Sequence, residues 1–147
     1  TVLIILFTGF LLCLPAGLLN TYLPSIIGLS EDDAFIAGFT EEPLKFLAFL
    51  MFVKSRKEFN EPMDAVVYGA LLSIGFATFE NYEYVYLYDD PTTKESLQMV
   101  WDRSFTAVPS HAFDGVIMGF FIGRHYYNRV RRRCIRVYRD TIKTCVY

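Results

Sequence analysis

Apolar stretches as long as whole helices follow one another along the chain, with polar segments between them. Four stretches are mostly apolar, at approximately residues 1–23, 34–53, 63–86 and 104–123. Crossing a bilayer takes about 20 mostly apolar residues at about 1.5 Å rise each. Short polar segments separate the four stretches. The pattern therefore predicts an all-α, polytopic membrane helix bundle with about four transmembrane helices in this chain.

The same pattern predicts two parts of the chain. Residues 1–123 are expected to form one transmembrane domain, and residues 124–147 a basic cytoplasmic tail. Apolar tail residues recur at near-helical spacing, so the tail is either an interfacial helix on anionic lipid or an ordinary basic flank. Because the chain starts at Thr1 and not at Met, we expect a fragment that can lack earlier residues or even earlier helices of a larger bundle.

Charge adds an orientation to this picture. The net charge of −2 gives no reason to expect a nucleic-acid partner, but the first 30 residues carry no charged side chain, while residues 124–143 hold eight of the 14 basic residues. Cytoplasmic flanks are enriched in Lys and Arg, so the tail and the loop after the second stretch are predicted to be cytoplasmic. The other two loops are acidic and predicted to face out, with Glu31, Asp32, Asp33, Asp89, Asp90, Glu95 and Asp102.

Ionisable side chains inside the apolar stretches are the strongest functional signal. Charge in hydrocarbon is costly and usually marks a site, a pairing or an aqueous path. Three stretches carry such groups at a similar depth, roughly 10 Å below the outer surface at about 1.5 Å rise per residue. We therefore expect them to meet in one polar cluster. They are Glu41, Glu42 and Lys45, then Glu80, Asn81 and Glu83, then His111 and Asp114.

Small residues four apart predict which helix faces touch. Residues at this spacing share a helix face, and small side chains let backbones approach closely. Such a stripe leads to His111 in the fourth stretch, and another leads to Asn81, beside Glu80, in the third. The polar groups are therefore expected on packing seams and not in lipid. The stripes are Gly115, Gly119 and Gly123, and Ala65, Gly69, Ser73 and Ala77.

Two prolines lie next to the predicted cluster. Pro43 directly follows the Glu41-Glu42 pair, and Pro109 precedes His111 by two residues. A proline removes a backbone donor, which a membrane protein tolerates where protein or water satisfies the freed carbonyl. The prolines predict either kinks at the level of the cluster or, alternatively, a helix that Thr40 caps and that begins at Glu41.

Three ordered motifs carry a family resemblance. Residues 41–45 form an EExxK motif, residues 75–81 a GFAxxEN motif, and residues 109–111 read Pro-Ser-His before a glycine-rich helix. This order, over roughly residues 38–123, resembles the PrsW family of membrane proteases, which is distantly similar to the CAAX-processing and bacteriocin-processing protease superfamily. This chain departs from those distant relatives at two positions. It has Glu80 where they have His, and Gly115 where they often have Asn or Asp.

The resemblance implies a function and a location. It implies an intramembrane endopeptidase that hydrolyses peptide bonds of membrane-anchored proteins near the extracytoplasmic side, with an anti-sigma factor as the type of substrate. It also implies a multi-pass protein of a prokaryotic cell membrane. Carried over by motif, the catalytic set is Glu41, Glu42, Glu80 and His111.

Hydrolysis needs a base for water, donors for the oxyanion and an acid for the leaving amine. Adjacent helical residues point about 100° apart, so one of Glu41 and Glu42 is predicted to be the base, and the other to pair with Lys45. Glu80 would assist proton transfer, with His111 and Asn81 as oxyanion donors.

A metal-assisted alternative uses the same groups. Glu42 (or Glu41), Glu80 and His111 would hold a divalent ion such as zinc, with water in the open position. Asp114, three residues from His111, would either orient the His111 ring or act as a hydrogen-bond partner in helix packing. Because the stretches contain a single histidine, we place metal-free glutamate chemistry ahead of this alternative, and no cofactor is predicted as certain.

A second class of function also fits the acids. A proton-coupled membrane transporter, or a non-catalytic binding scaffold, would use the same buried carboxylates. Four helices are few for a transporter, and no inverted repeat is visible.

Overall fold

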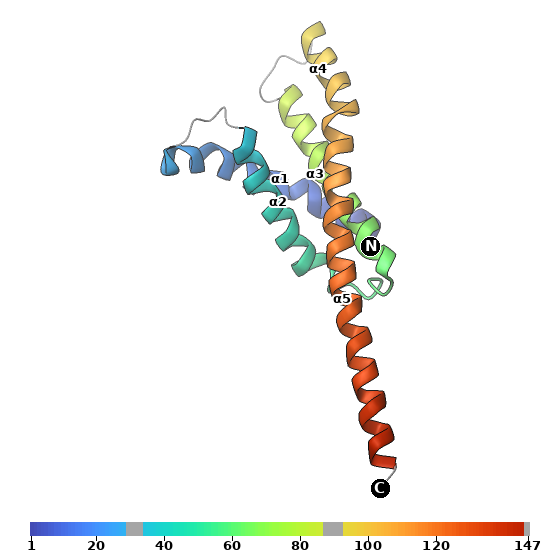
Figure 1. Cartoon of the computed structure of the whole chain (residues 1–147). Coiled ribbons are helices and arrows are strands. Elements are labelled where there is room, and N and C mark those ends of the chain that lie inside the picture. Colours follow the sequence, from blue (N-terminus) through green and yellow to red (C-terminus); the bar gives the residue numbers. More distant parts are fainter. Residues whose placement is uncertain (29–33, 87–92, 146–147) are drawn as a thin grey trace.

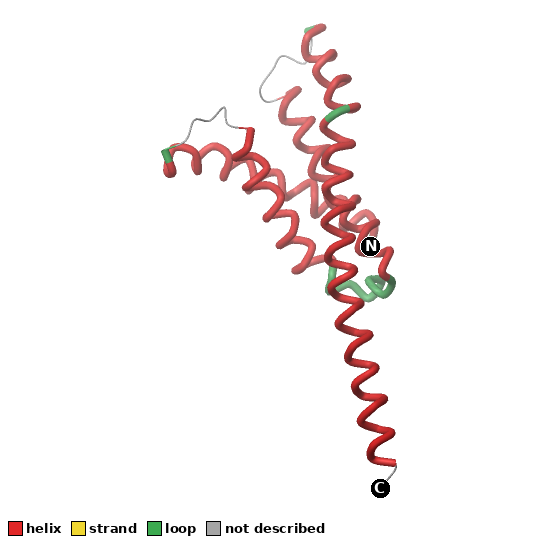
Figure 2. The backbone as a smooth tube through the Cα atoms, in the orientation of Figure 1, coloured by secondary structure: helices red, strands yellow, loops and turns green. Residues whose placement is uncertain are grey.

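The computed structural model describes residues 1–28, 34–86 and 93–145 as a set of helices. The order of elements is α1 (Val2–Ile27), α2 (Ala34–Ala48), the π-helical turn η1 (Phe49–Val53), α3 (Pro62–Tyr86), α4 (Lys94–Phe105) and α5 (Ala107–Cys145). No residue in the described ranges forms a β-strand (Figure 2). The all-α helix bundle predicted from the sequence is confirmed.

Three helical runs of the described chain are long and apolar enough to cross a membrane: α1, α3 and the run Lys94–Arg136 through α4 and α5. The remaining predicted stretch, 34–53, is helical throughout, but it consists of the 15-residue α2 followed by the five-residue η1. Its α-helix alone is therefore shorter than the about 20 residues that a span needs, and it carries the charged Glu41, Glu42 and Lys45.

The acidic loop residues used for the orientation lie partly outside the described residues. These are Glu31, Asp32, Asp33, Asp89 and Asp90. Glu95 and Asp102 were expected in a loop, and this expectation is wrong because both lie on α4. The side chain of Thr93 accepts a hydrogen bond from the Ser96 amide at 3.1 Å, which caps the first turn and starts this helix.

The helical run through α4 and α5 is interrupted at Thr106, a few residues before His111. The last residue of α4 is Phe105, α5 begins at Ala107, and Thr106 lies between them. Pro109 therefore lies in the first turn of α5, where its missing donor costs little, and this turn directly follows the interruption at Thr106. Pro43 lies inside α2, which begins at Ala34, so the alternative in which Thr40 caps a helix is wrong.

Helix α3 lies between α1 and α5, and glycines bring the backbones together (Figure 1). A Cβ atom on Gly69 would overlap the Gly115 carbonyl, and one on Gly119 would overlap the Ala65 carbonyl. The predicted seam between these two helices is confirmed. A second seam, which was not predicted from the sequence, brings Gly9 of α1 against the Leu72 carbonyl of α3.

Large apolar side chains cover the outside of the bundle. Leu3, Phe7 and Leu18 of α1 and Phe113 and Phe121 of α5 are all exposed. Exposed apolar surface of this kind is typical of helices long and apolar enough to cross a membrane. Beyond the bundle α5 continues to Cys145, so the predicted tail is helical and continuous with the last span (Figure 1).

The α3–α5 seam predicts a specific loss of stability. Gly115→Ala places a methyl group against the Gly69 carbonyl and the Ser73 hydroxyl, whereas a Cβ atom on Gly38 would have no neighbour within 4 Å, so Gly38→Ala serves as the control. Thermal unfolding in detergent should show Gly115→Ala destabilised by about 1–3 kcal/mol, as overpacking typically costs, and Gly38→Ala unchanged or more stable. Equal unfolding temperatures for both variants would contradict the seam.

Candidate functional site

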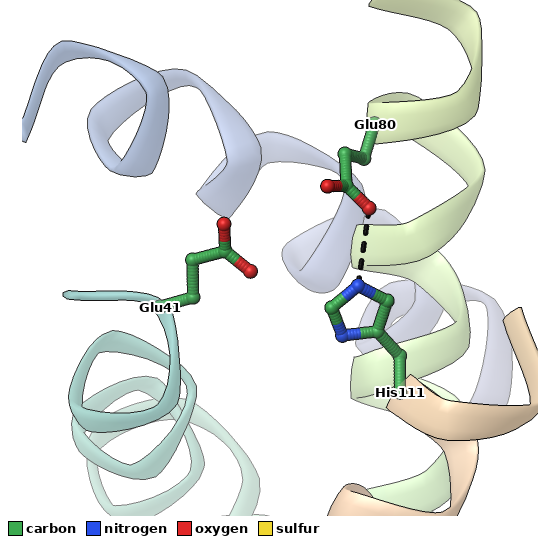
Figure 3. Close-up of side chains that lie close together, drawn as sticks. All are labelled: Glu41, Glu80 and His111. Atoms are coloured by element: carbon green, nitrogen blue, oxygen red, sulfur yellow. Dashed lines mark hydrogen bonds and ion pairs between the residues drawn. The ribbon is translucent and has the colours of Figure 1, made fainter. Parts of the chain in front are cut away.

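Three helices place acidic and imidazole groups at one point inside the bundle. Glu41 comes from α2, Glu80 from α3 and His111 from α5, and their side chains point toward one another (Figure 3). Each of the three offers a ligand atom, and these atoms lie within 4.8 Å of one another. The convergence predicted from helix depth and register is therefore present.

The ring of His111 is held from both sides. Its Nε2 lies 3.0 Å from Glu80 Oε2, and its Nδ1 lies 2.9 Å from Lys45 Nζ. An ammonium group can only donate, so Nδ1 accepts, and a neutral ring then carries its hydrogen on Nε2 and donates it to Glu80. These two contacts orient the ring.

Lys45 links α2 to the histidine. Its ammonium is fully buried, lies 2.7 Å from Glu42 Oε1 and 4.0 Å from Glu41 Oε2, and sits 4.2 Å from the centre of the Phe76 ring. The predicted pairing of Lys45 with one of the two glutamates is thus seen for Glu42. Glu42 is also the more accessible carboxylate, with 37% of its side chain exposed against 8% for Glu41.

Arg103 is a partner of the cluster that was not predicted from the sequence. Arg103 lies in the last turn of α4, pairs with Glu80 Oε2 at 2.8 Å and donates from Nε to Asn81 Oδ1 at 2.8 Å. Its guanidinium also stacks 3.8 Å from the centre of the Tyr84 ring. The signal available in the sequence was the deficit of cations, because Lys45 alone cannot balance the buried carboxylates.

Asn20 of α1 is a second residue that the sequence analysis missed. Its amide donates to Glu41 Oε1 at 3.1 Å, and its amide oxygen accepts a hydrogen bond from the Thr40 hydroxyl. A single Asn in the uncharged first stretch was a usable signal, since polar side chains in membrane helices usually bond to a neighbouring helix. Glu83 also faces α1, where the Cys13 thiol donates to its carboxylate at 3.2 Å.

The described carboxylates form two groups that could hold a metal ion. One is Glu41, Glu80 and His111, and the other is Glu42, His111 and Asp114. Of the two predicted alternatives, Glu41 with Glu80 and His111 forms one group, whereas Glu42 lies in the other group.

The chemistry of the site fits a divalent cation. Carboxylate oxygens and imidazole nitrogens are ordinary zinc ligands. When all are ionised, four carboxylates face two cations, so two net negative charges remain for an ion to balance. The charged residues are Glu41, Glu42, Glu80 and Asp114, with Lys45 and Arg103.

These observations define a class of protein: a helical membrane protein with a cluster of carboxylates and one imidazole between its helices. A family model described as PrsW family intramembrane metalloprotease matches residues 1–141. The chain belongs to this family. Relatives named Protease PrsW are 34% identical over 128 residues in Geobacillus kaustophilus and 35% identical over 97 residues in Bacillus subtilis.

The match covers only part of these relatives. It includes 85% of this chain and 54% of the Geobacillus protein, and 66% of this chain and 41% of the Bacillus subtilis protein. The chain thus spans about half the length of these relatives. No solved structure gives a significant match.

The contacts of His111 predict its tautomer. The chain has two histidines, so selective ¹⁵N labelling of the rings gives two sets of signals, and His111→Gln assigns them. In chelator-treated protein the His111 ring should carry its hydrogen on Nε2, because Lys45 donates to Nδ1. Lys45→Met should remove this preference, while the signals of His125 stay unchanged. A ring protonated on Nδ1 in the parent protein would contradict the geometry.

Proposed function

We propose that this chain forms the catalytic part of an intramembrane endopeptidase that hydrolyses peptide bonds of membrane-anchored proteins. The observation that carries the proposal is the meeting of Glu41, Glu80 and His111 from three helices within 4.8 Å. Membership of a family described as metalloproteases supports the same reaction. A transporter or scaffold would use the same acids, but it would not need a general base and a proton donor placed beside a scissile carbonyl.

Glu41, Glu80 and His111 would hold a divalent ion such as zinc. When bound, such an ion polarises a carbonyl and makes water more acidic. The surrounding residues orient these three side chains: Asn20 holds Glu41, and Arg103 holds Glu80. Hydrogen-bonded partners of this kind fix the direction in which a ligand atom points.

Glu42 would act as the general base, whereas the sequence analysis gave this role to the glutamate that does not pair with Lys45. The Glu42 carboxylate is the more exposed of the pair, and Lys45 at 2.7 Å holds it beside His111. Glu42 would take a proton from the attacking water and pass it to the leaving amine, which balances the proton over the reaction. The amide of Asn81, fixed by Arg103, would donate to the tetrahedral oxyanion.

The setting of the reaction follows from the charge pattern. The basic residues of α5 support a cytoplasmic C-terminus, and the acidic loops support an opposite face directed outward. The site would then act near the extracytoplasmic side of a bacterial cell membrane. An anti-sigma factor with a single membrane span is the type of substrate that the family resemblance suggests.

Glutamine substitutions separate the roles of the two adjacent glutamates. Glu41→Gln, Glu80→Gln and His111→Ala should lose both bound zinc and cleavage of a single-span membrane substrate. Glu42→Gln should keep zinc and lose cleavage by about 100-fold or more, since a general base contributes 10²–10⁴-fold. The measurements are zinc content of the purified protein and cleavage in reconstituted vesicles.

Glu61→Gln is the matched control, because Glu61 is exposed in the segment before α3 and should keep both zinc and activity. Cleavage retained in all four site variants would reject the catalytic assignment. Cleavage that survives complete removal of metal by a chelator would reject the metal and leave glutamate chemistry alone.

A further inference from the structure

A concave site lies between the stretch α2–η1 and helix α5, away from the polar cluster. It is a groove of about 1000 Å³, at the upper end of the roughly 300–1,000 Å³ typical of ligand pockets. Along α5 it begins at Met118, seven residues or about 10 Å past His111. The proposed peptidase reaction uses none of the groove's side chains.

One end of the groove is apolar. Phe46 and Leu50 line it from α2 and η1, and Met118 and Phe121 line it from α5. These residues belong to the helical stretches predicted to lie in the bilayer. An acyl chain in this end of the groove would stay at the depth that hydrocarbon occupies in the membrane.

The other end of the groove is strongly basic. Lys54 reaches it from the end of η1, and four arginines reach it from the continuation of α5. None of the described lining residues is acidic, so no side chain in the groove neutralises this charge. The arginines are Arg129, Arg132, Arg133 and Arg136.

We propose that this groove binds an anionic phospholipid from the leaflet on the side of the α5 tail, with its phosphate among the basic side chains and its acyl chain along the apolar end. Basic pockets between membrane helices attract anionic headgroups, and arginine pairs with phosphate through two parallel hydrogen bonds. The charge of the groove and its apolar wall fit both ends of one amphiphilic molecule. A soluble anion would use only the basic end.

Such a lipid would connect the elements that carry two residues of the polar cluster. Phe46 directly follows Lys45 on α2, and Met118 lies two turns beyond His111 on α5. A molecule that fills the groove therefore bridges the helices on which Lys45 and His111 meet.

Two double variants with equal charge test the proposal. Lys54→Gln/Arg133→Gln removes one groove cation from each wall. Lys57→Gln/Arg131→Gln removes one cation from each of the same two segments, but neither Lys57 nor Arg131 lines the groove. Native mass spectrometry of the full chain in neutral detergent, titrated with short-chain phosphatidylglycerol, gives the apparent affinity of each protein.

The parent protein and the Lys57/Arg131 variant should bind phosphatidylglycerol equally, and the Lys54/Arg133 variant about tenfold or more weakly. Equal weakening in both variants would overturn the proposal, because it indicates diffuse attraction to the tail. Equal binding of phosphatidylcholine, full competition by inorganic phosphate, or a second copy of the chain occupying the groove as a dimer would each overturn it as well.

Discussion

Charged side chains between membrane helices must be paired, and Glu80 is a residue at which two of these pairs meet. One of its carboxylate oxygens contacts both the His111 ring and the Arg103 guanidinium. A carboxylate left alone among apolar helices would be costly, so α3, α4 and α5 are held in the arrangement that supplies both partners. Through His111 and Lys45 the same network extends to Glu42 on α2.

Close backbone packing makes this network possible. His111 lies four residues before Gly115 on the same face of α5, and Gly115 meets Gly69 of α3. Because these backbones approach so closely, the side chains of His111 and Glu80 reach one another directly at 3.0 Å. The small residues thus have a structural role, and the reactive groups depend on the spacing that they set.

The sequence predicted the helical membrane fold and the convergence of Glu41, Glu80 and His111, because apolar length, residue depth and helical register are local properties. It did not predict Arg103 or Asn20 as partners. Arg103 lies beyond the interruption at Thr106, so its reach to Glu80 depends on the angle at which α4 leaves α5. Asn20 depends on how α1 crosses the bundle, and that crossing is set by contacts such as Gly9 with Leu72. Which glutamate joins Glu80 also depends on the rotation of α2.

The most direct test of this account is a distance measurement in the bilayer. Solid-state NMR of reconstituted, chelator-treated protein can report the dipolar coupling between ¹⁵N on the His111 ring and ¹³C on glutamate carboxylates. The account predicts a measurable coupling from Nε2 to a carboxylate carbon, since Glu80 Oε2 lies 3.0 Å from Nε2, and its loss in Glu80→Gln. No coupling in the parent protein, or a coupling that survives Glu80→Gln unchanged, would contradict it.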